Sequence, residues 1–219
     1  MDGLLLVNKP LGMTSFDVIR RLRRQTGVRK IGHAGTLDPM ASGLMLMLFG
    51  TACKQAQSYS KLDKRYVGEV TLGRTSSTGD REGELTPVSE RVPDAEEVAA
   101  ALVKLTGQIT QTPPAYSAIK INGREAYKRV RAGETVVMPS RTVTVYENQL
   151  LRYDYPVLEL DSRVSSGTYI RTLAEDLGQL LGTGAYLSGL VRTEVGDYTL
   201  DEAVVLDEAD AAMVAQHLR

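Results

Sequence analysis

The chain has 219 residues, 42% of them hydrophobic and 24% charged, an ordinary balance for a globular protein with a sizeable core. Its net charge of −1 does not indicate a nucleic-acid binder, so any RNA site must be a local basic patch. The single cysteine, Cys53, excludes an internal disulfide and a zinc site built from several cysteines. No cationic segment precedes the first apolar run, and the longest apolar run, residues 44–49, is too short to span a bilayer. We therefore expect a cytoplasmic protein.

Strand and helix signals are mixed along the first half of the chain. Thr14, with Asp17 three residues later, predicts the start of a helix, and Gly27 predicts its end. Strand patterns cover residues 4–7, 44–48 and 64–72, and helical patterns cover residues 51–62 and 94–106. Residues 31–43 form a predicted glycine-rich loop, and residues 75–83 are polar and expected to be flexible.

The second half begins with a Pro-Pro turn in a stretch, residues 108–140, that is rich in Lys, Arg and Gly. Further strands are predicted at residues 142–154, 157–164 and 195–199, and further helices at residues 169–181 and 207–218. Because strands and helices do not alternate regularly, we expect an α+β fold with a largely antiparallel sheet.

The segment from Gly32 to Leu44 is the densest in residues that carry chemistry. Asp38 precedes Pro39, which favours an extended backbone and a carboxylate held in one direction on a loop. The plainer reading is that Asp38 only begins a turn, and spacing alone favours that reading. His33 has a similar alternative, a histidine satisfied by backbone groups, and with His217 as the only other histidine a zinc site is improbable.

The same segment fills every fixed position of the pattern Gly-His-x-Gly-Thr-Leu-Asp-Pro-x-Ala-x-Gly, and so it closely resembles the catalytic loop of the TruB pseudouridine synthases. The resemblance implies that Asp38 is the catalytic aspartate. It also implies that His33 contacts RNA and helps to hold the T loop around a flipped base.

Four further segments, in the family's order, extend the resemblance over residues 4–203. They are Lys9-Pro10-Leu11-Gly12-Met13-Thr14-Ser15, the stretch from Lys64 to Gly83, the stretch from Thr112 to Tyr127, and Ser166-Gly167-Thr168-Tyr169-Ile170-Arg171. The implied fold is the pseudouridine synthase fold, with a mixed, mostly antiparallel central sheet flanked by helices. We expect one catalytic domain over residues 1–219, with a thumb-like insertion at about 114–142. Residues 201–219 are too few for a C-terminal PUA domain, and we expect none.

The resemblance assigns roles to four residues that each have a plainer reading. Tyr66 would stack on the target base and help proton transfer, although spacing alone favours a core tyrosine. Arg171 stands where a helix begins, and the helix dipole makes this an unfavourable place for a cation. We therefore expect Arg171 to have a tertiary partner, and Asp38 is the expected one. Tyr169 would line the pocket. Leu190 would pack on the nucleotide, although a plain core leucine is as good a reading.

Two basic stretches, residues 20–30 and 120–131, are candidates for phosphate contacts, but for residues 20–24 a solvated helix face is a serious rival. The predicted substrate contacts with positive charge are Lys9, Lys120, Arg124 and Lys128. Two positions, Tyr186 and Val191, depart from the family's usual His and Arg, which puts RNA contacts from those positions in doubt.

The implied activity is isomerisation of uridine to pseudouridine at position 55 in the T loop of tRNA. The base is flipped out, and Asp38 acts on the ribose as nucleophile or general base. We expect no cofactor and no metal, the tRNA T stem-loop as partner, no membrane contact, and a monomer. The alternatives are an RNA-binding module that helps tRNA to fold and a pseudouridine synthase that acts on another RNA. An Asp/His hydrolase is a poor third reading, because only His33 would partner the aspartate.

Overall fold

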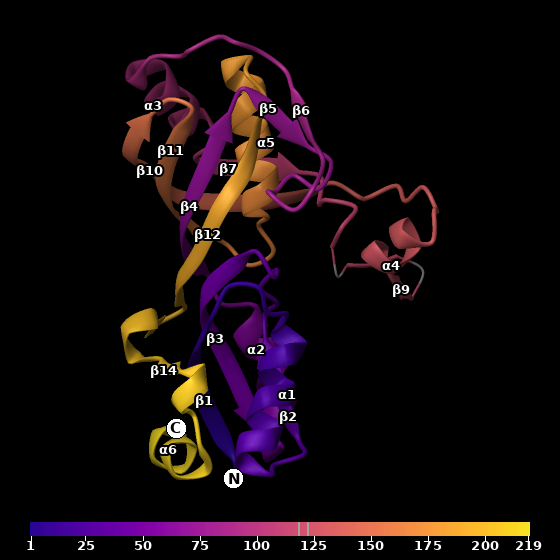
Figure 1. The fold of residues 1–219 in the computed structure, drawn as a ribbon, viewed down its shortest axis with the longest axis vertical. Helices are drawn as coiled ribbons and strands as arrows, with labels where there is room; N and C mark the ends of the chain where they lie inside the picture. The colour runs from indigo at the N-terminus through magenta and orange to yellow at the C-terminus, as the bar shows by residue number, and fades with distance from the viewer. Residues whose placement is uncertain (118, 122) are drawn as a thin grey trace. The chain divides into compact units, whose positions relative to one another are not determined.

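The computed structural model describes residues 1–117, 119–121 and 123–219, so Ala118 of the third motif lies outside the described residues. The chain folds into two compact units (Figure 1). Unit 1 comprises Met1–Val67 with Leu190–Arg219, and unit 2 comprises Gly68–Gly189. Strands β4 (Lys64–Leu72) and β12 (Ala185–Val195) each contribute residues to both units.

Unit 1 is built around strand β3 (Ala41–Phe49), which is buried along almost its whole length. The strand order is β14-β1-β3-β12, and β2 and β13 are attached to β3 and β12. Both faces of β3 are covered by other elements, which explains its continuous apolar sequence. Leucines of β1 and β3 form the hydrophobic core of the unit. The other elements are β1 (Gly3–Lys9), α1 (Ser15–Thr26), β2 (Ile31–Ala34), the 3-10 helix η1 (Gly50–Gln55), α2 (Ala56–Ser60), β13 (Tyr198–Thr199), the 3-10 helix η2 (Leu200–Glu202), β14 (Val204–Val205), the 3-10 helix η3 (Leu206–Glu208) and α6 (Ala211–His217).

Helix α1 follows its sequence signals closely. Thr14 and Asp17 form a reciprocal capping box, and Gly27 ends the helix in the left-handed conformation with φ of 71°. The buried face holds Val18, Ile19 and Leu22, as predicted. The helix start is therefore fixed, and Ser15, the first helical residue, faces the interior.

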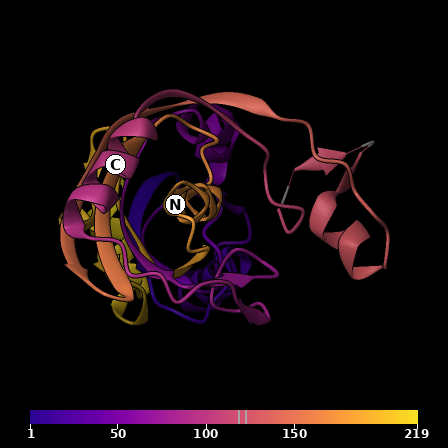
Figure 2. The same cartoon turned by 90° about the horizontal axis from the view of Figure 1, so that it is seen from above.

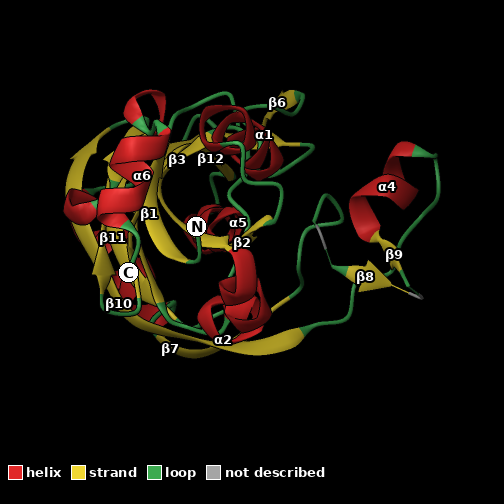
Figure 3. Ribbon diagram, turned by 90° about the horizontal axis from the view of Figure 1, so that it is seen from below, coloured by secondary structure: helices red, strands yellow, loops and turns green. Residues whose placement is uncertain are grey.

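Unit 2 contains a second stretch of sheet, with the order β12-β4-β11-β10-β7. Helix α3 packs against β10 and α5, and Ile170 of α5 lies over Gly68 of β4 (Figure 1). A separate hairpin and short helix stand apart from this sheet (Figure 2; labelled in Figure 3). The elements are β5 (Arg74–Ser76), β6 (Leu85–Pro87), α3 (Ala95–Lys104), β7 (Gly107–Gln111), β8 (Lys120–Ile121), β9 (Arg124–Glu125), α4 (Ala126–Arg131), β10 (Arg141–Asp154), β11 (Val157–Val164) and α5 (Ile170–Leu181).

The sheet pairings are mixed and mostly antiparallel, which confirms the predicted α+β class. The pairs β1–β3, β2–β3, β7–β10, β10–β11 and β12–β13 are antiparallel, whereas β12–β3 and β1–β14 are parallel. Among the described residues, no helix is both long enough and apolar enough to cross a membrane.

Several predicted boundaries were wrong. The loop predicted at residues 31–43 is shorter, because both of its ends pair as β2 and β3 and only residues 35–40 remain. The helix predicted at residues 51–62 is divided into η1 and α2. The strand predicted at residues 195–199 is divided, because β12 ends at Val195 and β13 begins at Tyr198 after a turn. Most of β12, from Ala185, was not predicted, because its glycine-interrupted pattern hides a strand that tertiary partners stabilise.

Candidate active site

The loop at residues 35–40, which carries Asp38, is tied to the turn before α1. The Ser15 hydroxyl, 3% exposed, donates to the Leu37 carbonyl at 3.0 Å and accepts from the Leu37 N–H at 2.9 Å. The Gly12 N–H donates to the Pro39 carbonyl at 2.8 Å. The residues before and after Asp38 are therefore fixed by Ser15, the first residue of α1, and by Gly12 in the turn before it.

Asp38 itself is half-buried, and its carbonyl accepts from the Ala41 N–H at 3.1 Å in the turn that leads into β3. A buried hydroxyl that satisfies both backbone groups of a neighbouring residue leaves a loop little freedom. These bonds hold the backbone around Asp38, and the direction of its carboxylate, which the Asp-Pro pattern predicts to be fixed, stays a prediction.

Three other predicted site residues of unit 1 lie on the strands around this loop. His33 lies on β2, where burial and, after it, the Arg192 charge lower the pKa of its imidazole. Leu190 lies opposite Ala41 in the parallel pairing of β12 with β3. Ala41 is three residues after Asp38 in the chain. Tyr66 is on the buried face of β4, with an exposed fraction of 9%.

Lys9, a predicted substrate contact, is fully buried at the end of β1. Its ammonium donates to the carbonyls of Pro10 at 2.9 Å and Met13 at 2.7 Å. These carbonyls belong to the turn whose Gly12 bonds to the loop. The burial favours a role in holding that turn, and direct contact with a substrate stays a prediction.

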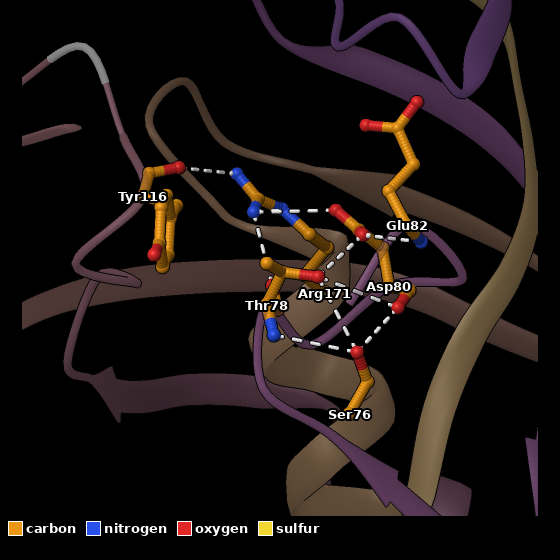
Figure 4. A network of polar contacts seen from close by, with 6 residues as sticks. All are labelled: Ser76, Thr78, Asp80, Glu82, Tyr116 and Arg171. Carbon is orange, nitrogen blue, oxygen red and sulfur yellow. Dashed lines mark hydrogen bonds and ion pairs between the residues drawn. The ribbon is translucent and has the colours of Figure 1, made fainter. Parts of the chain in front are cut away.

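Arg171 lies in the first turn of α5 in unit 2 and is 5% exposed (Figure 4). Its guanidinium donates to the Thr78 carbonyl at 3.1 Å and the Tyr116 carbonyl at 2.8 Å, and lies 3.3 Å from a carboxylate oxygen of Asp80. The expectation that this cation needs a tertiary partner is confirmed. No pattern in the sequence indicated that Asp80 would be such a partner.

Asp80 is itself fixed by the turn that it closes (Figure 4). Its Oδ1 accepts from the Thr78 hydroxyl at 2.7 Å and from the Glu82 N–H at 3.0 Å, and the Ser76 hydroxyl donates to its carbonyl. Residues 76–82, expected to be flexible, therefore form a hydrogen-bonded turn around a buried ion pair. Such a pair fixes geometry more than it adds stability, because burying both charges is costly.

Glu175, one turn after Arg171 on α5, has a raised pKa. Burial is the main cause, the charge of Asp176 adds to it, and the Arg171 guanidinium opposes it. The carboxylates near Arg171 thus differ in role: Asp80 pairs with the cation directly, whereas Glu175 is disfavoured as an anion.

Tyr169 precedes α5 and is held at its backbone by the side chain of Gln111. The Gln111 amide accepts from the Tyr169 N–H at 3.0 Å and donates to its carbonyl at 3.2 Å, while the Arg141 guanidinium stacks 5.0 Å from the centre of its ring. This arrangement leaves the ring only partly buried. Gln111 is a second residue that the sequence reasoning missed.

The predicted cationic contacts Lys120, Arg124 and Lys128 gather on β8, β9 and α4, which we call the basic hairpin-helix segment (Figure 3). All three are exposed. Lys128 pairs with Glu125 at 3.1 Å, which raises the pKa of its ammonium, and lies 5.8 Å from the centre of the Tyr127 ring. An aromatic ring among cations is a suitable surface for RNA.

The structure thus gathers the predicted residues into two groups. His33, Asp38, Tyr66, Leu190 and Lys9 belong to unit 1, and Arg171, Tyr169 and the basic hairpin-helix segment belong to unit 2. The predicted pairing of Asp38 with Arg171 joins the two groups and stays a prediction. Among the described residues, no cluster of three His, Cys, Asp or Glu side chains is arranged to hold a metal ion.

Family models match the chain along most of its length. Residues 23–170 match the TruB family pseudouridylate synthase N-terminal domain, and residues 171–219 match the tRNA pseudouridylate synthase B C-terminal domain.

The curated relatives of this chain are named tRNA pseudouridine synthase B. The chain is 47% identical over 213 residues to tRNA pseudouridine synthase B of Cupriavidus metallidurans, covering 96% of this chain and 68% of the relative. It is 46% identical to the Burkholderia lata protein of that name, covering 94% of this chain and 64% of the relative. The chain therefore spans about two thirds of the length of these relatives.

Solved structures agree on the fold. A Cbf5-Nop10-Gar1 complex contains a chain that matches 94% of this one with a TM-score of 0.75 at 27% identity, and 53% of that chain is covered. A Nop10-Cbf5 complex of an archaeal box H/ACA sRNP matches with a TM-score of 0.70 at 26% identity, with 52% of that chain covered. These likenesses confirm the predicted pseudouridine synthase fold, and the family models and relatives place the chain in the TruB family of tRNA pseudouridine synthases.

Proposed function

We propose that this chain isomerises uridine to pseudouridine at position 55 in the T loop of tRNA, with Asp38 as the catalytic carboxylate. The observation that carries the proposal is the complete catalytic-loop motif, held by the buried Ser15 hydroxyl and by the Gly12 N–H. Membership of the TruB family supports the reaction. The tRNA T stem-loop is the proposed partner, and the cytoplasm is the proposed location.

The reaction breaks the bond between uracil N1 and ribose C1′, turns the base, and joins C5 to C1′ with loss of the C5 proton. The base must first leave its stack, at a cost of a few kcal/mol that binding in a pocket recovers. Asp38 then attacks C1′ or removes a ribose proton to give a glycal. In either route, the Arg171 guanidinium keeps the Asp38 carboxylate ionised and aimed.

The other predicted residues divide between the base and the phosphates. Tyr66 stacks on the base and assists proton transfer, Tyr169 and Leu190 line the pocket, and His33 contacts the T loop. The basic hairpin-helix segment, within a thumb-like insertion at about 114–142, binds the stem. In this proposal, residues 1–219 act as one monomeric catalytic domain.

The test is tritium release from a tRNA transcript labelled at uridine C5, with wild-type protein and with Asp38→Asn. We expect Asp38→Asn to bind tRNA within about threefold of the wild type and to release no tritium above background, because the amide is not a nucleophile. Asp154→Asn, at an exposed position on β10, is a control of the same chemistry and should keep full activity. Turnover by Asp38→Asn would refute the assignment, and tRNA refolding without tritium release by the wild type would favour the RNA-folding alternative.

A further inference from the structure

Arg192 on β12 has the largest side chain among the fully buried residues of the described chain, with an exposed fraction of 1%. Burying a guanidinium is costly unless its donors find good acceptors, and an apolar residue of similar size often replaces a buried charge without loss of stability. The position of its donors therefore needs a reason beyond filling the core.

One of these donors reaches the first residue of the Asp38 loop, and another reaches the strand that follows the loop. Nε donates to the Leu44 carbonyl in β3 at 2.8 Å, and Nη2 donates to the Gly35 carbonyl, directly after β2, at 3.3 Å. Residues 36–43, which include Asp38, lie between these acceptors. One rigid guanidinium thus joins the residue at which the loop begins to the strand into which it leads.

The backbone around the guanidinium is shaped for this close approach. Arg192 pairs with Gly43, whose φ is 106°, and a Cβ at Gly43 would lie 2.3 Å from the Arg192 carbonyl oxygen. Gly35 has a φ of 92°, and a Cβ there would lie 3.5 Å from Nη1. Gly43 of the catalytic-loop motif therefore admits the Arg192 backbone, whereas at Gly35 a Cβ would make only an ordinary contact and glycine suits the positive φ.

We propose that Arg192 is a positioning residue for the reaction, one that holds the Asp38 loop in its reactive conformation by bonding the Gly35 and Leu44 carbonyls. The inference rests on the proposed function of Asp38 and adds to it a residue that does not touch the substrate. Ser15 holds the middle of the loop, and Arg192 joins its first residue, Gly35, to β3.

Arg192→Lys separates this role from simple core packing. Lysine keeps the charge and most of the volume, but its single nitrogen lacks the fixed fork that spans both carbonyls. We expect kcat for tritium release to fall about 100-fold, as for a catalytic group displaced by about 1 Å, while KM for tRNA stays within about threefold. Arg91→Lys is the matched control, because the Arg91 guanidinium also donates to a backbone carbonyl, that of Leu181, in unit 2.

A second readout does not depend on activity. Amide hydrogen exchange in the Arg192→Lys protein should accelerate at Leu37 and Ala41, whose N–H groups donate to the Ser15 hydroxyl and the Asp38 carbonyl, and stay unchanged in β10 and β11. Accelerated exchange at the loop supports the inference even if the wild type releases no tritium, a result that would refute only the proposed function. Unchanged exchange at the loop, or equal acceleration throughout the protein, would overturn the inference, as would a kcat within twofold of an active wild type.

Discussion

The Asp38 loop and the basic hairpin-helix segment both carry predicted site residues, but different interactions hold them in place. The loop is fixed by two side chains that are almost completely buried, Ser15 and Arg192. The segment is held mainly by local backbone bonds and by exposed ion pairs, such as Lys128–Glu125 at 3.1 Å, with side chains 59% and 30% exposed. Exposed pairs of this kind contribute little, about 0–1 kcal/mol.

This difference fits the two tasks that the proposal gives to these regions. A catalytic carboxylate must be held to within a fraction of an ångström, whereas cations that bind phosphates can adjust to the RNA. Variants of the first kind of region should therefore change kcat, and variants of the second should change KM.

After the complete loss expected for Asp38→Asn, the next largest effect is expected for Asp80→Asn, which changes the buried ion pair in unit 2. An asparagine removes the Asp80 carboxylate, which lies 3.3 Å from the Arg171 guanidinium, so Arg171 loses one of the contacts that hold it in place. We expect kcat for tritium release to fall about 100-fold, with KM within about threefold. Glu147→Gln, which removes an exposed carboxylate 4.0 Å from Arg163, is the control and should be silent. A kcat near that of the wild type would show that Asp80 does not support catalysis.

A smaller effect is expected when Lys120, Arg124 and Lys128 are all replaced by Gln. Loss of up to three phosphate contacts should raise KM for tRNA about tenfold and reduce the salt dependence of binding, with kcat unchanged. The control replaces three exposed lysines elsewhere, Lys54, Lys61 and Lys104, so that net charge falls equally. If both triple variants bind tRNA equally, the segment is not the RNA-binding surface.

The smallest effect concerns Lys64, a buried cation at the start of β4. Burial, reinforced by the Arg192 charge, lowers the pKa of Lys64 to about 8, while Asp63 opposes the shift. Between pH 8 and pH 9.5 the unfolded chain binds more protons at this site than the folded chain, so the free energy of unfolding should rise with pH. We expect a gain of about 1 kcal/mol, measured by urea unfolding.

Lys64→Met should lack this gain, and Lys61→Met, at an exposed neighbouring position, should retain it. Parallel pH profiles for the wild type and Lys64→Met would contradict a lowered pKa for the buried lysine.

Local signals predicted the elements that depend on local physics. The capping box at Thr14, the alternation in β4 and the α+β class were read correctly, because caps and periodicity act over a few residues. The extent of β12 was missed because Gly184, Ser188 and Gly189 disguise a strand whose stability comes from distant partners.

The candidate site shows the same limit. Motif resemblance pointed to Asp38 and Arg171, since those residues stand in recognisable segments. The contacts that hold them, such as Asp80 with Arg171 and Arg192 with Gly35, join residues far apart in the chain. Asp80 lies in the motif stretch from Lys64 to Gly83, and Arg192 directly follows Val191, but nothing local indicated that either side chain would be buried against the site.

The central claim, that this chain converts one tRNA uridine into pseudouridine, is tested most directly by mapping pseudouridine in a tRNA transcript after incubation with the purified protein. Carbodiimide adducts on pseudouridine stop reverse transcriptase and report the position. The account predicts one new stop, at position 55, which is absent from a transcript with cytidine there. A transcript without a stop, or with stops only outside the T loop, would contradict it.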